Sequence, residues 1–238
     1  MEDWKLQPAR DHGLPPTQRW KSERREGGLI SRTSQFTARA AVRAYLTVYH
    51  RVEFIGRENL PPRGPLILSA NHASHLDAIL LAQAVPWSLR RNLFPVAAGD
   101  VFFETPVIAA FAATIINALP MWRHKVGRHA LDDLRSRLVD HGASYILFPE
   151  GRREPDGQLL PFKAGIGMMI GGTSIPVVPC YIHGAFEAMP RDKILPRPRK
   201  ISVRIGKPMS FESLPHGREG WNQIAADLEQ AARALASR

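Results

Sequence analysis

Short apolar runs that alternate with helical patterns are the feature that most constrains the fold of this chain. Six runs have the length and apolar content of buried strands, at residues 52–55, 66–70, 93–97, 145–148, 177–182 and 201–205. Helical patterns stand between several of these runs. Alternation of this kind is typical of an α/β fold, in which helices cover a central sheet.

The predicted helices have recognisable ends. We expect them at residues 34–50, 78–84, 107–116, 129–139 and 221–235. Thr105 followed by Pro106 resembles a helix N-cap with proline at the first helical position. Gly142 stands where the fourth helix should end. The fifth helix is rich in alanine and closes the chain.

The first of these helices carries basic side chains on one stripe. The stripe contains Arg32, Arg39, Arg43 and His50, and the opposite side contains Ala41, Tyr45 and Val48. One interpretation is a surface helix that packs its apolar side on the domain and leaves the basic face in solvent. The other is a basic amphipathic helix that lies on anionic lipid head groups.

Charge and cysteine content bound the partners and the compartment. The 238-residue chain has a formal net charge of +10 and a single cysteine. Such a basic chain needs a negatively charged partner, for which nucleic acid, an anionic bilayer and a phosphorylated substrate all qualify. One cysteine excludes a disulfide within the chain and a multi-cysteine metal site, which favours a reducing, cytosolic compartment.

The chain reads as one domain preceded by an arm. We expect a flexible N-terminal arm at residues 1–30 and a domain at 31–238 that includes the basic helix. The first residues mix acids and prolines and do not resemble a secretory signal. The longest apolar stretch, residues 107–119, is too short to span a bilayer, which needs about 20 apolar residues.

A polar cluster directly follows the second predicted strand. Residues 66–77 read Leu-Ile-Leu-Ser-Ala-Asn-His-Ala-Ser-His-Leu-Asp. His72 and Asp77 are five positions apart, so inside one regular helix they would point about 140° away from each other. They can meet only if His72 lies in the loop and Asp77 in the first turn of the following helix. Asp77 can then orient one ring nitrogen and leave the other as a base.

Other interpretations of this cluster stay open at this point. His72 could simply cap the helix. His72, His75 and Asp77 are also metal-ligand types, although no second cluster completes a coordination shell. A nucleophilic Ser69 or Ser74 would lack the Gly-x-Ser-x-Gly turn of serine hydrolases. The remaining interpretation is a base that acts directly on a substrate hydroxyl.

A second strand leads into a charged loop at residues 145–154. Pro149 interrupts the hydrogen-bond ladder, and Gly151 permits an unusual backbone turn. Arg152 and Arg153 carry planar guanidinium groups suited to phosphate. The alternative is a solvated turn in which neighbouring glutamates pair with these arginines, and such surface pairs contribute little stability.

Three further segments carry weaker signals. The glycine-rich stretch 161–172 lacks the spacing of a nucleotide-binding loop, so close helix packing is the better explanation for its glycines. Residues 119–123 form a short strand-like piece that ends in Arg123. Residues 193–207 contain basic side chains and no acid. This stretch suits lipid or coenzyme A phosphates, and a merely solvated edge is the alternative.

Taken in order, these blocks resemble the lysophospholipid acyltransferase family of the 1-acyl-glycerol-3-phosphate acyltransferase, or PlsC, type. Residues 71–77 match its Asn-His-x4-Asp block, and residues 148–153 match its Phe-Pro-Glu-Gly-Thr-Arg block. Residues 175–179 resemble its Val-Pro-Val-Val-Pro block, and Arg123 stands where the family has the arginine of its second block. The resemblance extends over residues 45–215.

The resemblance implies a mixed, largely parallel sheet and a direct transfer mechanism. His72 would take the proton of the acceptor hydroxyl as that hydroxyl attacks a thioester carbonyl, and Asp77 would orient the imidazole. The residues that would bind substrate, chiefly its phosphate or polar head, are Asn71, Arg123, Glu150, Gly151, Arg152 and Arg153.

The same resemblance implies the reaction partners and the location. The donor would be acyl-CoA or acyl-carrier protein, and the acceptor a lysophospholipid, above all 1-acyl-glycerol-3-phosphate, which would give phosphatidate. No metal or redox cofactor and no nucleic acid are implied. The chain would act as a peripheral protein on an anionic membrane surface, at the cytoplasmic side of the cell membrane.

Two departures from the family pattern bear on the acceptor. Arg152 replaces the threonine of the family, and residues 98–103 lack the lysine that many members carry there. The alternatives are therefore a different acceptor, such as a lyso-aminolipid, or a non-catalytic phospholipid-binding protein. A nucleic-acid-binding module would need aromatic platforms or a recognition helix, which the basic stretch does not offer.

Overall fold

The computed structural model describes residues 15, 32–90, 92–98, 119–121, 128–152, 156–190, 193 and 195–237. Two predicted segments lie outside these residues, namely the helix at 107–116 and, apart from Pro15, the N-terminal arm. Arg123 and Arg153 lie outside them as well.

The described residues form a seven-stranded sheet with the order β1-β7-β6-β2-β5-β3-β4. Its strands are β1 (Glu53–Ile55), β2 (Ile67–Ala70), β3 (Leu93–Ala98), β4 (Leu119–Met121), β5 (Ser144–Leu147), β6 (Val177–His183) and β7 (Ser202–Ile205). Within this sheet only β6 and β7 pair antiparallel. The predicted mixed, largely parallel α/β sheet is confirmed, and β4 is the strand-like piece before Arg123.

Helices flank this sheet. They are α2 (Arg32–Tyr49), α3 (Asp77–Ala84), α4 (Trp87–Arg90), α7 (Arg128–Asp140), α8 (Gly165–Ile170), α9 (Ala185–Ala188) and α10 (Arg218–Ala236), with a 3-10 turn at Arg57–Asn59. The predicted helices at 34–50, 78–84, 129–139 and 221–235 are confirmed, with ends shifted by a few residues. The short helices α4, α8 and α9 were not predicted, because each spans less than two helical turns of sequence pattern.

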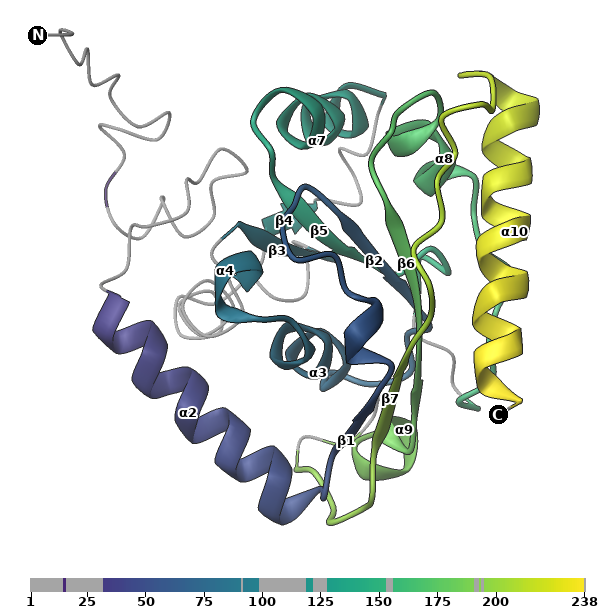
Figure 1. Cartoon of the computed structure of the whole chain (residues 1–238). Helices are drawn as coiled ribbons and strands as arrows, with labels where there is room; N and C mark the ends of the chain where they lie inside the picture. The colour runs from purple at the N-terminus through teal and green to yellow at the C-terminus, as the bar shows by residue number, and fades with distance from the viewer. Residues whose placement is uncertain are drawn as a thin grey trace, which may run out of the picture.

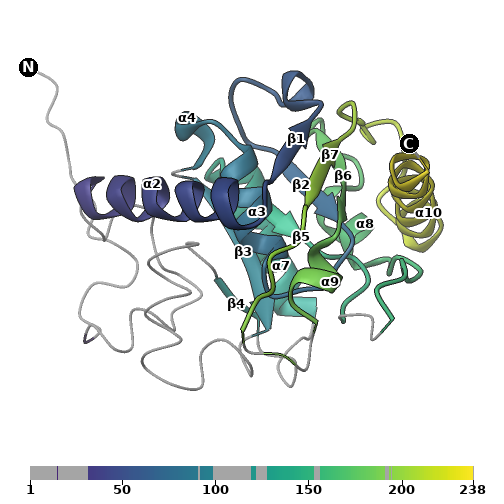
Figure 2. The same cartoon turned by 90° about the horizontal axis from the view of Figure 1, so that it is seen from below.

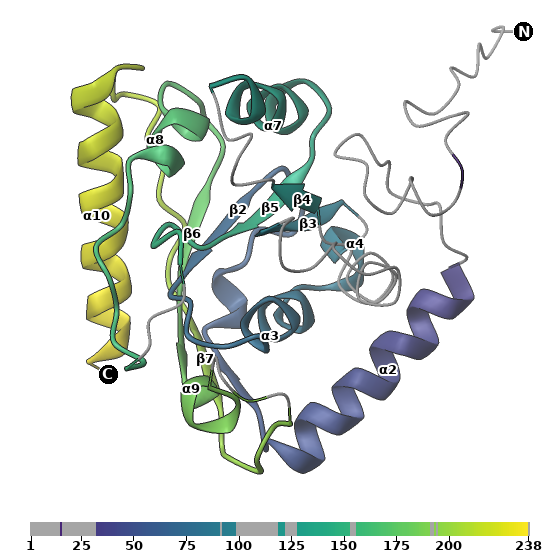
Figure 3. The same cartoon turned by 180° about the vertical axis from the view of Figure 1, so that it is seen from behind.

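The helices form two layers, one on each face of the sheet (Figure 1). Helices α2, α3 and α4 lie on one side, and α7, α8 and α10 lie on the other, as the view from behind also shows (Figure 3). The alternation of side chains along β2 separates two hydrophobic cores, because Leu68 and Ala70 point to the α3 side and Ile67 points to the α10 side. The molecule is thus a three-layer α/β/α domain.

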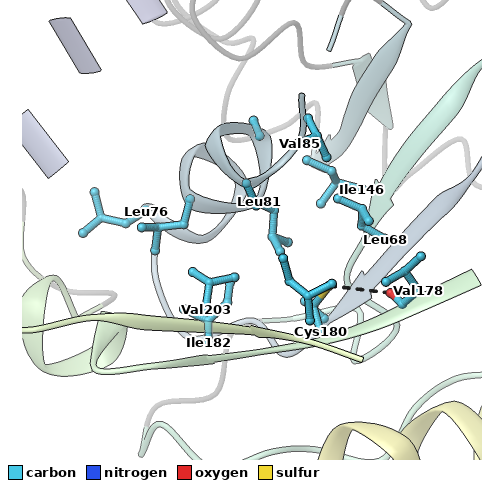
Figure 4. Close-up of a cluster of buried hydrophobic side chains, with 14 of the residues drawn as sticks. Leu68, Leu76, Leu81, Val85, Ile146, Val178, Cys180, Ile182 and Val203 are labelled. Carbon is cyan, nitrogen blue, oxygen red and sulfur yellow. Dashed lines mark hydrogen bonds between the residues drawn. The ribbon is translucent and has the colours of Figure 1, made fainter. Parts of the chain in front are cut away.

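The core on the α3 side fixes the start of that helix against the strands. Leu76 and Leu81 belong to one cluster of buried side chains with Leu68 of β2 and Val178 of β6, shown in the close-up (Figure 4). The side chains of this core are almost completely buried. Because α3 begins directly after the polar cluster, this packing also holds the cluster in place.

The register of the three central strands determines where the loops emerge. In the parallel ladder Ser69 of β2 lies opposite Leu147 of β5 on one side and opposite Pro179 of β6 on the other. The carboxyl ends of the three strands therefore share one edge of the sheet. In open α/β sheets this edge is where ligands bind.

Helix α2 packs on the domain through part of the stripe that was predicted to face outward, although Arg43 of that stripe is exposed as expected. Arg39 faces the domain, where its guanidinium donates a hydrogen bond to the carbonyl oxygen of Val85 at 2.7 Å and lies over the ring of Trp87. Tyr45 and Val48, predicted to pack inward, are exposed. The view from below shows α2 alongside α3 and away from α10 (Figure 2).

The aliphatic side chains of α2 determine which of its faces packs on the domain. Leu46 is buried and Val42 packs against the same core, so the contact stripe is set by these two aliphatic side chains. Arg39 lies on the same side of α2 as these two residues. Its guanidinium reaches the C-terminal end of α3, where backbone carbonyls lack helical partners and attract cations. His50, also predicted to be on the outer stripe, is fully buried.

The glycine-rich stretch serves close helix packing, as predicted. A methyl group added at Gly167 of α8 would collide with the backbone of Trp221 in α10. A methyl group added at Gly165, two residues earlier in the same helix, would meet open space. Arg135 of α7 donates to the carbonyl oxygens of Met169 and Gly171, which secures the end of α8.

We predict that Gly167→Ala lowers the free energy of unfolding by about 1–3 kcal/mol, because α8 and α10 must separate to admit the methyl group. Gly165→Ala is the matched control, and we expect it to be neutral or to stabilise the helix by about 0.5–1 kcal/mol. Urea unfolding of both variants checks this. Equal stability of the two variants would contradict the close packing of α8 on α10.

We also predict a pH effect at His50, whose ring Nε2 lies 3.0 Å from the hydroxyl of Tyr45. Burial lowers the pKa of His50 below its ordinary value of about 6.5. Between the two pKa values, His50 therefore binds a proton in the unfolded chain and stays neutral in the folded chain. The stability contributed by neutral His50 is complete above about pH 6.5 and is lost as the pH falls through the lowered pKa.

Melting temperatures at pH 7.5 and pH 5.5 test this prediction. We expect the wild-type protein to lose more stability on acidification than His50→Gln, which can keep a hydrogen bond to Tyr45 and does not titrate. Equal losses in the two proteins would show that His50 is not responsible.

Candidate active site

His72 and Asp77 meet as the sequence predicts. The Nδ1 atom of His72 lies 2.9 Å from the Oδ2 atom of Asp77. His72 stands in the loop after β2, and Asp77 is the first residue of α3. Since a carboxylate only accepts, Nδ1 of the neutral imidazole carries the proton and Nε2 keeps its lone pair. The imidazole is in the tautomer that a general base needs.

The Asp77 carboxylate is buried and organises the whole loop. Its Oδ2 atom also accepts the backbone N–H groups of Ala73 and Ser74, each at 2.8 Å. Its side chain is completely shielded from solvent. The position at the start of α3 places a negative charge where the helix dipole favours one. The residue therefore satisfies backbone donors and orients His72 at the same time.

Phe148, which follows β5, covers one face of the His72 ring. Its ring stacks on the His72 ring with centroids 4.1 Å apart and planes inclined by 18°. The His72 side chain keeps 19% of its surface exposed. The stacked ring restricts rotation of the imidazole, so His72 is held by Asp77 at its edge and by Phe148 at its face. In the sequence, Phe148 stands out only as the first residue of the 148–153 motif, and no pattern there predicts its contact with His72.

The structure decides between the other interpretations of the cluster. The Ser74 hydroxyl donates to the carbonyl oxygen of Met189 and accepts the N–H of Leu76, so it is engaged in the loop. Ser69 is buried within β2. A nucleophilic serine is therefore not supported. The N-cap residue of α3 is Leu76, which makes no side-chain capping hydrogen bond, so His72 is not a helix cap.

A metal site is the remaining alternative. Among the described residues no group of three His, Cys, Asp or Glu side chains is arranged to hold a metal ion.

Two further predicted site residues lie directly beside His72. Glu150 is buried and accepts the backbone N–H of His72 at 2.9 Å through Oε1. Asn71 is buried as well, and its amide bonds both to the carbonyl oxygen of Ile182 at 3.0 Å and to the N–H of Ile182 at 2.7 Å. Ile182 belongs to β6, so this strand supports the site from behind.

The Gly151–Arg152 turn faces outward. Gly151 has a φ of +72°, a conformation that favours glycine. The Nζ atom of Lys163 lies close to Gly151, where it would be within 2.8 Å of an added methyl group. Arg152 is exposed beside them. No local sequence pattern places Lys163 beside this turn, so its position there comes from the tertiary structure.

The structure thus brings together His72, Asp77, Glu150 and Asn71, and places Gly151 and Arg152 on the adjoining turn. Whether these side chains bind substrate stays a prediction. The same holds for Arg123 and Arg153, which lie outside the described residues.

Fold and site together define the class of protein: an α/β domain with a histidine–carboxylate pair at the carboxyl edge of its sheet. The family model described as Acyltransferase matches residues 51–183, more than half of the chain, and contains this pair. The chain therefore belongs to the Acyltransferase family.

Individual relatives agree with this assignment. The chain is 32% identical over 148 residues to the chloroplastic 1-acyl-sn-glycerol-3-phosphate acyltransferase BAT2 of Brassica napus, covering 60% of this chain and 40% of that protein. It is 24% identical over 167 residues to the 1-acyl-sn-glycerol-3-phosphate acyltransferase alpha of Mus musculus, covering 69% and 56% of the two chains. The match thus spans about half the length of these relatives or less.

The fold also has a counterpart among solved structures. The crystal structure of PlsC, the 1-acyl-sn-glycerophosphate acyltransferase from Thermotoga maritima, superposes with a TM-score of 0.67 at 24% identity. The superposition covers 86% of this chain and 80% of that one. The likeness confirms the α/β architecture that the sequence predicts.

Proposed function

We propose that this chain is an O-acyltransferase that moves a fatty acyl group from a thioester to the hydroxyl of a lysophospholipid. The first candidate acceptor is 1-acyl-glycerol-3-phosphate, which would give phosphatidate. The observation that carries the proposal is the His72 imidazole, held by buried Asp77 at the carboxyl edge of the sheet. Membership in the Acyltransferase family and the names of its relatives support the same chemistry.

The proposed step needs one proton acceptor and no covalent enzyme intermediate. The Nε2 atom of His72 takes the proton of the acceptor hydroxyl while that oxygen attacks the thioester carbonyl carbon. The carbon–sulfur bond then breaks, and the departing thiolate receives the proton from the imidazolium. Asp77 stabilises the imidazolium in between. General-base assistance of this kind typically contributes about 10²–10⁴-fold.

Phosphate recognition follows from the charge around the site. Acyl-CoA and acyl-carrier protein both carry phosphate, as does the proposed acceptor, and the chain has a net charge of +10. Arg152 is exposed on the turn after Glu150, and Lys163 lies against the same turn. Together with Arg123 and Arg153, these cations are the proposed contacts to the head group. No metal or redox cofactor enters this scheme.

Membrane contact would be made through α2. Val48 is 80% exposed, and Phe36 and Tyr45 are exposed with it. The loop after α9 adds Leu195, which is 79% exposed, and its neighbour Pro196 accepts a hydrogen bond from the hydroxyl of Tyr49 at the end of α2. Apolar side chains on a basic surface suit peripheral attachment to an anionic bilayer.

Within the described residues, no helix combines the length and the apolar character needed to cross a bilayer. The proposed location is the cytoplasmic side of the cell membrane, in peripheral attachment.

The proposal is tested by offering the purified protein a panel of acceptors. The panel contains 1-acyl-glycerol-3-phosphate, lysophospholipids with other head groups and a lyso-aminolipid, each with acyl-CoA and with acyl-carrier protein as donor. Mass spectrometry of the lipids reports the product. Product from a lyso-aminolipid alone would change the acceptor, and binding of lipid without any product would leave a phospholipid-binding protein.

We predict that His72→Ala lowers the rate of acyl transfer by about 10²–10⁴-fold, because the general base is lost. Its melting temperature should stay close to that of the wild-type protein, since the ring lies in a partly exposed loop. The control is His141→Ala, an exposed histidine after α7, which should transfer at the wild-type rate. Full activity of His72→Ala would refute the assignment.

We further predict that Val48→Asp weakens binding to anionic phospholipid vesicles by about tenfold or more, because an apolar side chain no longer enters the lipid. The matched control is Val139→Asp, an exposed valine on α7 on the opposite side of the sheet. Co-sedimentation measures both. Equal binding of the Val48→Asp variant and the wild-type protein would show that the outer face of α2 does not contact the membrane.

A further inference from the structure

Glu150 is shielded from solvent between the two loops that form the site. Only 1% of the residue is exposed. Its Oε1 atom accepts the backbone N–H of His72 at 2.9 Å, and its Oε2 atom accepts the backbone N–H of Leu160 at 3.3 Å. Each carboxylate oxygen thus bonds to the main chain of a different loop.

We infer that Glu150 is a positioning residue for His72 and not a ligand of the acceptor head group, an inference that rests on the proposed acyl transfer. It replaces the head-group role that the sequence pattern predicts for this glutamate. The carboxylate acts on the main chain of His72, whereas Asp77 acts on its ring.

The loop around His72 is held at three successive residues by three different elements. Asn71 is anchored to Ile182 of β6 through both ends of its amide. The N–H of His72 is anchored to Glu150, after β5. The N–H of Ala73 is anchored to Asp77 of α3. Because these partners come from separate elements, the peptide that carries the imidazole has little freedom to shift.

The backbone turn at Gly151 separates two roles within one motif. With a φ of +72° at Gly151, Glu150 faces inward to the His72 loop while Arg152 is exposed. The inner carboxylate is therefore suited to position the base, and the outer guanidinium is suited to meet a phosphate. A carboxylate beside a phosphate would repel it, which further favours the inner role for Glu150.

The chemistry of the side chain matters at this position. Glutamine has one acceptor oxygen and an NH₂ group, so in Glu150→Gln that NH₂ would face one of the two backbone N–H donors. Aspartate keeps the charge but is one methylene shorter, so it cannot reach both loops. A misplacement of about 1 Å in a catalytic group can cost about 10²-fold in rate.

The test is steady-state kinetics of the full chain with 1-acyl-glycerol-3-phosphate and acyl-CoA. We expect Glu150→Gln and Glu150→Asp to lower kcat at least tenfold, with the KM for the acceptor within about threefold of the wild-type value. Arg152→Gln should show the opposite pattern, a raised KM for the phosphate-bearing acceptor. Glu212→Gln, an exposed glutamate outside the site, is the matched neutral control.

A double-mutant cycle separates positioning from general structural damage. If Glu150 acts through His72, Glu150→Gln should cost less than about threefold in a His72→Ala background, because there is no imidazole left to position. A head-group ligand would cost the same in both backgrounds and would raise KM. That outcome would overturn the inference while leaving the proposed function intact.

Two further experimental outcomes have separate meanings. A wild-type protein that transfers no acyl group to any acceptor would refute the proposed function itself. All kinetics are measured below the melting transition of each variant, and Glu150→Asp, which retains the buried charge, serves if Glu150→Gln does not fold. Unchanged kcat in the folded Glu150→Asp variant would also overturn the inference.

Discussion

The buried carboxylate of Asp77 is the interaction on which the rest of the site depends. It accepts two backbone N–H groups and the Nδ1 hydrogen of His72 through a single oxygen. A buried charge is tolerated only when it is hydrogen-bonded, and Oδ1 has no partner among the described residues. The ionised carboxylate therefore depends on these three bonds and on the loop conformation that supplies them. The oxygen that fixes the backbone before α3 also sets the tautomer of the neutral imidazole. Local folding and the proposed chemistry therefore have one common cause.

The sheet supplies further contacts that hold the His72 loop in place. Since β2 lies between β5 and β6, the loops after the three strands emerge together. Glu150 reaches the His72 main chain from the β5 side, and Ile182 holds Asn71 from the β6 side. Phe148 then covers one face of the imidazole. The proposed base is thus held at its ring edge, its ring face and its backbone, by elements that are distant in sequence.

Helix α2 was predicted from the sequence, but the face that it packs on the domain was not. Periodicity correctly predicted a helix, but it could not tell which face packs inward, because the aliphatic Val42 and Leu46 lie beside the basic stripe while Tyr45 and Val48 lie opposite it. The guanidinium of Arg39 lies inside because it finds the carbonyl of Val85 and the ring of Trp87, and neither partner is visible from the helix itself. Tyr45 and Val48 are left outside as a result. That outcome supplies the apolar surface for the proposed membrane contact.

By itself, the sequence determined the described strands and longer helices, because these follow from local periodicity. For His72 and Asp77 it set the condition under which they could meet, with His72 in a loop and Asp77 in the first helical turn. It also indicated that the glycines near Gly167 serve packing. Only the tertiary structure decided that Glu150 faces the His72 main chain and that Phe148 stacks on the ring. The physical reason is that these contacts join separate strands. Their geometry depends on strand order and register, which no local pattern encodes.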